Sequence, residues 1–142
     1  MPEESATPDL IEITRRAAEA ANRRDIDGLM AFFAPDALVD GTRTVGGLWR
    51  GRPAIRAFVE DWASAYEELE WEFEEPVDLG NGVVFAVVPQ KGSLVGGAGY
   101  VQQREAWVVV WVDDLMASVT YYPEADIAEA RAAAERLAEE RR

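Results

Sequence analysis

The chain has 142 residues, 49% of them hydrophobic, and its 14 basic and 27 acidic side chains give a formal charge of −13. This length predicts about one domain, and the acidity argues against nucleic acid and anionic membranes as partners, since both would repel it. Histidine and cysteine are absent, which excludes histidine-based triads, disulfides, and zinc sites with imidazole or thiolate ligands.

The ends and hydropathy of the chain predict a cytoplasmic protein. No apolar run of about 18 residues is present, so no transmembrane helix is expected. The first ten residues are acidic and lack the apolar segment of a secretory signal. We expect residues 1–6 to be a disordered lead and residues 7–142 to form a single domain. Neither a metal nor an organic cofactor is expected, so any acid–base chemistry would fall to a carboxylate tuned by burial.

The first half of the chain predicts three helices and one short strand. Thr7 and Pro8 have the residue types of a helix cap and first helical position, and an amphipathic helix follows them. A shorter helix is expected to include Met30 and Phe33, before a brief strand over residues 37–40. After a glycine-rich loop, Pro53 opens a helix whose apolar residues recur every three or four positions: Ile55, Phe58, Val59, Trp62 and Tyr66.

The second half predicts antiparallel strands and a last helix. Apolar and polar residues alternate over 69–79, and further strands are expected over 83–95, 100–112 and 115–122. Turn residues at 80–82, 96–99 and 113–114 separate them. An alanine-rich helix is expected from Pro123 to about residue 139. This order predicts an α+β domain with a cone-shaped, curved antiparallel sheet, three helices on its concave face and a C-terminal helix.

The strand over residues 100–112 separates two kinds of side chain. Because alternate residues point to opposite faces, Gln103, Glu105, Trp107 and Trp111 share one face, which we expect to line the cone. The valines of "WVVVWV" that face the other way also need cover. They predict a homodimer packed through the outer face of the sheet.

Two stretches of the sequence resemble a known superfamily. "AFFAPDALVDG…LWRGRPAIRAFVEDW" and "MASVTYYPEADIAEA" are similar to SnoaL-like proteins of the nuclear transport factor 2-like superfamily, including its ketosteroid isomerase-like members. The likeness covers roughly residues 8–130. It implies a pocketed α+β fold, and its members include isomerases, polyketide cyclases, epoxide hydrolases and dehydratases. Where the isomerases have a carboxylate base this chain has Gly41, with Asp40 one residue earlier, and their second acid falls at Trp107.

Two carboxylates are the candidate catalytic residues. Asp40 ends the first strand, where it is either a turn-former that bonds its own loop or a base at the mouth of a cavity. Glu105 either lies among large rings as a general acid or is solvated and pairs across the strands with a base such as Lys91. The sequence leaves both questions open.

The aromatic residues are either core or ligand contacts. The candidate substrate-binding residues are Trp49, Trp62, Tyr66, Gln103, Trp107 and Tyr121. Two functions remain: a cofactor-free enzyme that does carboxylate acid–base chemistry on a small hydrophobic molecule, and a non-catalytic binder of an apolar metabolite. A packed cone without a pocket is the third outcome. An enzyme needs an acid with a shifted pKa inside the pocket, whereas a binder needs only rings and a few hydrogen bonds.

Overall fold

A strongly curved sheet organises the computed structural model, which describes residues 9–44, 46–72, 74–97 and 99–141. The described residues form seven strands, paired in the order β2-β1-β7-β6-β5-β3, with β4 also beside β5. Their bounds are β1 (Phe33–Asp40), β2 (Leu48–Arg50), β3 (Tyr66–Trp71), β4 (Glu74–Gly80), β5 (Val83–Leu94), β6 (Tyr100–Val112) and β7 (Leu115–Pro123).

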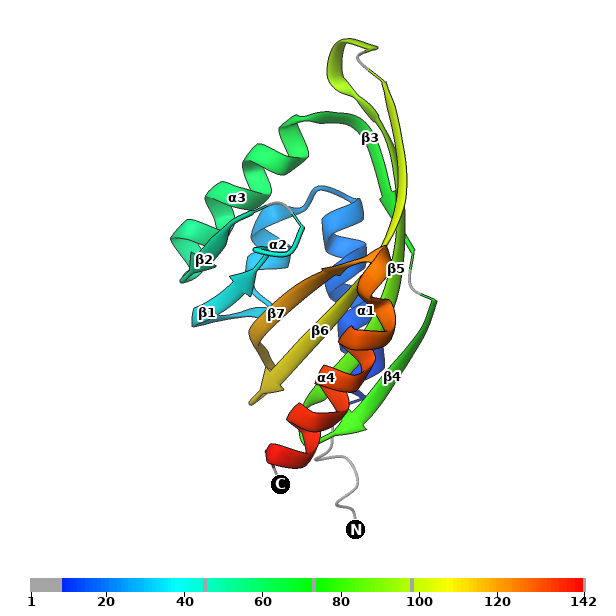
Figure 1. The fold of residues 1–142 in the computed structure, drawn as a ribbon. Coiled ribbons are helices and arrows are strands. Elements are labelled where there is room, and N and C mark those ends of the chain that lie inside the picture. Colours follow the sequence, from blue (N-terminus) through cyan, green and yellow to red (C-terminus); the bar gives the residue numbers. More distant parts are fainter. Residues whose placement is uncertain (1–8, 45, 73, 98, 142) are drawn as a thin grey trace.

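Helices cover both faces of this sheet. Three of them, α1 (Leu10–Asn22), α2 (Ile26–Met30) and α3 (Arg52–Ser64), lie on the concave side, and α4 (Ile127–Glu140) lies on the convex side (Figure 1). Short 3₁₀ turns, η2 (Val95–Gly97) and η3 (Glu124–Asp126), follow β5 and β7. This arrangement confirms the predicted α+β class. Within the described ranges, no helix is long and apolar enough to cross a membrane.

The alternation of β6 divides the hydrophobic core in two. Trp107, Val109 and Trp111 pack with α1, α2 and α3 in the concave cluster. Val108 and Val110 pack with α4 in the convex cluster. The predicted assignment of β6 residues to two faces is therefore correct.

Helix α4 covers two of the three outward-facing valines that motivated the expected homodimer, Val108 and Val110. Ala130 and Ala134 are both fully buried, and they pack on the convex cluster that contains Val83, Val108 and Val110. The small alanine side chains let the helix approach the sheet closely. Val108 and Val110 are thus covered within one chain and no longer argue for a second copy, whereas Val112 at the end of β6 is 43% exposed.

The first helix begins later than its sequence predicts. Asp9 caps α1, because its Oδ1 accepts hydrogen bonds from the backbone N–H groups of Ile11 (3.1 Å) and Glu12 (3.2 Å). The expected cap at Thr7 and Pro8, like the expected lead over residues 1–6, lies outside the described residues.

The first strand is longer than expected and pairs in parallel with β7. It starts at Phe33, which the sequence placed in a helix, and Phe33 is aligned with Met116 of β7. Arg52 fixes this end, since its Nε donates to the Phe33 carbonyl at 2.9 Å. The sheet is therefore antiparallel except at this pair, which local periodicity does not reveal.

Two further boundaries differ from the expectation. Tyr66 opens β3 instead of ending the face of α3, which stops at Ser64. The segment expected as one strand over 69–79 is divided between β3 and β4, each of which pairs with β5. Two strands along β5 thus replace the expected single strand, and of these two β3 lines the cavity.

The packing of α4 predicts a position-specific loss of stability. Ala134→Asp places a carboxylate where the native side chain is 0% exposed, and an uncompensated buried charge costs about 3–5 kcal/mol. Ala128→Asp, at an exposed position of the same helix, is the matched control and should cost less than about 1 kcal/mol. Urea unfolding followed by tryptophan fluorescence measures both. Equal losses would contradict the burial of α4 on the sheet.

Candidate functional site

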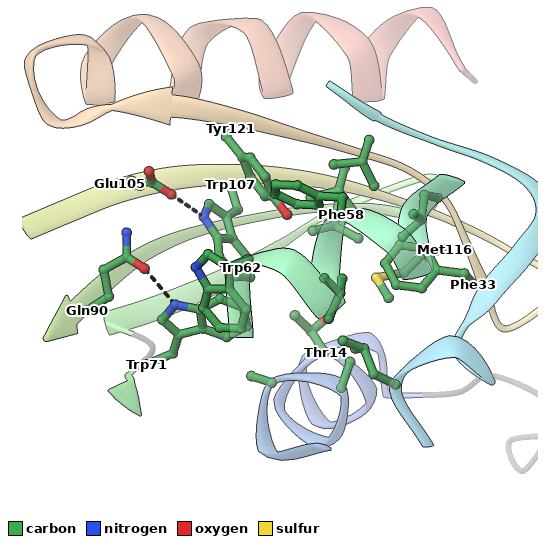
Figure 2. A pocket seen from close by; sticks show the side chains of 18 of the residues that line it. Thr14, Phe33, Phe58, Trp62, Trp71, Gln90, Glu105, Trp107, Met116 and Tyr121 are labelled. Carbon is green, nitrogen blue, oxygen red and sulfur yellow. Dashed lines mark hydrogen bonds between the residues drawn. The ribbon is translucent and has the colours of Figure 1, made fainter. Parts of the chain in front are cut away.

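A cavity of about 120 Å³ lies between the concave face of the sheet and helices α1 and α3. Its described walls come from the helices, mostly through apolar side chains, from alternate residues of β6, from residues of β7, and from one or two residues each of β1, β3 and β5. Figure 2 shows Glu105 and Gln90 at one end of the cavity and Phe33 and Met116 at the other. The cavity therefore has a polar end and an apolar end.

Glu105 is the one carboxylate among the described lining residues. It is half-buried, and its Oε1 accepts a hydrogen bond from Nε1 of Trp107, two residues along the same face of β6, at 3.1 Å. Burial raises the pKa of Glu105, and the Trp107 hydrogen bond opposes this by favouring the ionised form. A carboxyl group in this setting keeps its proton to a higher pH than one in water does, and its ionised form is a stronger base.

Tyr121, on β7 directly opposite Trp107, supplies a hydroxyl to the same cavity. Its side chain points inward, with the oxygen turned toward Phe58 (Figure 2). Burial, together with the nearby charge of Glu105, raises the pKa of Tyr121 far above its usual value. The hydroxyl thus stays protonated at any physiological pH, and it can donate to an oxygen of a bound molecule.

Trp71 and Gln90 form the wall next to Glu105. The Trp71 Nε1 donates to Gln90 Oε1 at 2.6 Å across the β3–β5 pair. Asn22, at the end of α1, holds the backbone of Trp71 through two hydrogen bonds of 2.8 and 3.0 Å. The position of this indole is therefore fixed by both the sheet and the first helix.

The apolar end is closed by packing and by one buried polar contact. Phe33 and Met116 line this end, and both are buried. Thr14 accepts a hydrogen bond from Trp111 Nε1 at 3.1 Å, and its hydroxyl donates to the Leu10 carbonyl at 2.7 Å. Because this hydroxyl already has partners in the chain, this end of the cavity is suited to an apolar group.

Aromatic rings continue along the cavity from α3 to β7. Trp62 stacks on Trp71 with 4.5 Å between ring centroids, Trp71 meets Trp107 edge to face at 4.9 Å, and Trp107 lies 5.2 Å from Tyr121. Tyr66 lies 6.1 Å from Trp62 at the start of this row. Offset and edge contacts of this kind stabilise aromatic clusters, so the wall is built before any ligand binds.

Six of the eight candidate site residues come together here. The residues that line the cavity are Glu105, Trp62, Tyr66, Gln103, Trp107 and Tyr121. The alternative partner considered for Glu105, Lys91, instead lies 3.8 Å from Glu70. Gln103 is exposed to solvent, so it lies at the rim of the cavity.

Asp40 and Trp49 are not among the cavity-lining residues. The Oδ1 of Asp40 accepts hydrogen bonds from the backbone N–H (3.0 Å) and hydroxyl (2.6 Å) of Thr42, and these lower its pKa. This is the turn-forming alternative that the sequence left open. Trp49 stacks on Phe58 with centroids 3.9 Å apart, and only Phe58 reaches the cavity.

Sequence reasoning missed Trp71 and Gln90. Both lie on strands whose apolar face was recognised, but neither was assigned to the site. The pairing register carries the missing signal, because Trp71 is opposite Gln90 and Gln90 is opposite Gln103. Residues that face each other across adjacent strands share one face of the sheet.

The described residues hold no group of three or more side chains suited to a metal ion. What the cavity offers is proton transfer at Glu105, hydrogen bonding at Tyr121 and Gln90, and apolar contact elsewhere. These capabilities suit a small organic molecule with a polar group at one end.

Solved structures with the same fold come from several bacteria. An NTF2-like protein of unknown function from Burkholderia pseudomallei is 20% identical, with a TM-score of 0.72, over 87% of this chain and 95% of that one. A ketosteroid isomerase-like protein from Catenulispora acidiphila, in complex with trimethylamine, is 17% identical, with a TM-score of 0.71, over 78% and 84% of the two chains. A Mycobacterium tuberculosis protein in complex with estradiol-17β-hemisuccinate is 18% identical, with a TM-score of 0.70, over 82% and 95%.

Sequence comparison gives the family. No curated protein sequence is similar enough to count as a relative. The SnoaL-like domain model, however, matches residues 14–119, which extend from α1 into β7 and include most of the strands that form the cavity. The chain therefore belongs to the family of SnoaL-like domains.

Proposed function

We propose that this chain binds a small, largely apolar molecule in the cavity and that Glu105 exchanges a proton with it, without a cofactor. The observation that carries this proposal is the position of Glu105, a half-buried carboxylate with a raised pKa on an otherwise aromatic wall. Groups with perturbed pKa values in a cleft are candidates for acid–base catalysis.

The reaction that suits these groups is proton removal from a carbon next to a carbonyl. Glu105 takes the proton, and negative charge develops on the carbonyl oxygen. The Tyr121 hydroxyl, which stays protonated, donates to that oxygen and stabilises the charge. The surrounding rings exclude water, which strengthens both interactions. Return of the proton from Glu105 to another carbon would complete an isomerisation.

The volume of the cavity limits the size of the ligand. A cavity of about 150 Å³ holds one benzene ring, and the cavity here measures about 120 Å³. The similar structures bound to trimethylamine and to a steroid ester support small-molecule binding in general. We propose a molecule of about one ring, since the four rings of a steroid exceed this volume.

Asp40 has no part in this proposal, because both of its known contacts are to Thr42 in its own loop. Trp49 acts indirectly, by supporting Phe58 from behind.

Binding without catalysis is the second candidate. One observation favours it: Glu105 is a single carboxylate, and one of its oxygens already accepts from Trp107. A binder needs no second acid or base, and the same rings would hold an apolar metabolite.

The burial of Glu105 predicts a pH-dependent difference in stability. Because its pKa is raised in the folded state, the native protein binds this proton more tightly than the unfolded chain, so stability falls as pH rises above the ordinary value of about 4.3. The Glu105→Gln variant has no carboxyl group at this position, so its stability does not fall with pH for this reason. Urea unfolding at pH 4 and pH 8 should show the variant gaining free energy of unfolding relative to wild type at the higher pH. A difference that does not change with pH would contradict the assignment.

Proton exchange in D₂O tests the proposed reaction. Wild-type protein should accelerate deuterium incorporation next to the carbonyl of cyclohexanone, cyclohex-2-enone or acetophenone, followed by ¹H NMR. Glu105→Gln should slow the enzymatic rate by about 100-fold or more, and Tyr121→Phe should slow it by a similar factor.

The matched control is Asp40→Asn, which makes the same change of carboxylate to amide outside the cavity and should keep the wild-type exchange rate. If Glu105→Gln keeps the wild-type rate of deuterium exchange, Glu105 is not a catalytic residue. Quenching of tryptophan fluorescence by these ketones without any exchange would favour the binder.

A further inference from the structure

The charged side chain that lines the cavity is negative. Among the described lining residues there is one carboxylate, Glu105, and no lysine or arginine. No ion pair joins Glu105 to a basic side chain within the described part of the chain; its carboxylate accepts a hydrogen bond from the Trp107 indole. A partly buried carboxylate is costly to ionise unless an opposite charge accompanies it. The described lining residues do not supply that charge.

The side chains around Glu105 are also of the kind that attracts cations. Trp107 is its hydrogen-bond donor, and Tyr121 lies 5.2 Å beyond Trp107, between ring centroids. Trp62 and Trp71 continue the aromatic wall (Figure 2). The faces of indole and phenol rings carry negative electrostatic potential, and they bind ammonium groups more strongly when water is excluded.

A second hollow lies near the polar end, where the charged side chains of β3, β5 and β6 point to the other face of the sheet. This acidic groove is lined by Glu70, Glu72, Glu74, Glu124, Lys91 and Arg104, among others, and it shares Gln90 and Gln103 with the cavity. Lys91 lies 3.8 Å from Glu70, and Arg104 pairs with Glu74 (3.0 Å) and Glu124 (3.5 Å).

The four carboxylates of the acidic groove thus outnumber its two cationic side chains, on a chain whose formal charge is −13. A cleft with an excess of negative charge raises the local concentration of cations and repels anions. The net negative charge near the polar end and the carboxylate inside the cavity therefore favour the same sign of ligand charge.

We infer that the molecule bound in this cavity carries a positive charge, as an organic ammonium or iminium group attached to an apolar part of about one ring. The cation lies beside Glu105 and the faces of Trp107 and Tyr121, and the apolar part points toward Phe33 and Met116. This inference rests on the proposed function and adds the chemical class of the ligand. It agrees with a base role for Glu105, because a neighbouring cation favours the ionised carboxylate.

Three molecules of nearly equal size test the charge preference. Benzylamine is the cation at pH 7, benzyl alcohol is the neutral counterpart, and benzoate is the anion. Titrations at low salt, followed by tryptophan fluorescence and calorimetry, should give benzylamine a dissociation constant about tenfold lower than that of benzyl alcohol. Benzoate should bind most weakly.

Glu105→Gln should bring benzylamine and benzyl alcohol to within about twofold of each other. Its matched control is Glu129→Gln, the same change at an exposed position of α4 on the other side of the sheet, which should keep the tenfold preference. Raising the salt concentration should reduce the preference only in part, because the carboxylate is half-buried.

The outcomes separate the two proposals. Equal binding of benzylamine and benzyl alcohol overturns the cationic ligand. A preference that survives in Glu105→Gln overturns the position of the cation beside Glu105. Either result leaves the pocket proposal in place. No binding of any of the three molecules overturns both.

Discussion

The alternation of side chains along β6 is the constraint on which the other features depend. One strand supplies Glu105, Trp107 and Val109 to the concave face and Val108 and Val110 to the convex face. A shift of register by one residue would exchange these sets and place valines in the cavity. The convex set needs α4 as its cover, and the concave set needs α1 and α3 to close the cavity. The long pairing with β5 on one side and β7 on the other fixes that register.

The cavity gains a group able to transfer protons because the alternation of β6 places one carboxylate, Glu105, on the concave face of the sheet. Glu105 lies between Gln103 and Trp107 on the concave face of β6, and among the described residues the Trp107 indole supplies the hydrogen bond to its side chain. Such a group contributes little to stability. A buried polar group whose lost hydration is not fully replaced by hydrogen bonds or ion pairs is a candidate functional group, because folding gains nothing from burying it. The Tyr121 hydroxyl, turned into the same space (Figure 2), supplies a second group for a ligand to bind.

Much of this architecture could be predicted from the sequence, because it depends on local period. The faces of β6, the hairpin before Val83 and the helix after Gly51 follow from alternation, turn residues and a proline. The parallel pairing of β1 with β7 could not be predicted, because it joins segments far apart in the chain. Asp40 remained ambiguous for a related reason: a carboxylate at a strand end serves a turn or a pocket equally well, and only the loop conformation distinguishes them. Trp71 and Gln90 required the β3–β5 register.

The most direct measurement is a crystal structure of the protein soaked with 4-bromobenzylamine, with the bromine located by its anomalous scattering. The account predicts one bromine site between the concave face, α1 and α3, near Phe33 and Met116, and the ammonium nitrogen within about 3.2 Å of a Glu105 oxygen. Bromine found only outside this cavity, or inside it with the ammonium turned away from Glu105, would contradict the account.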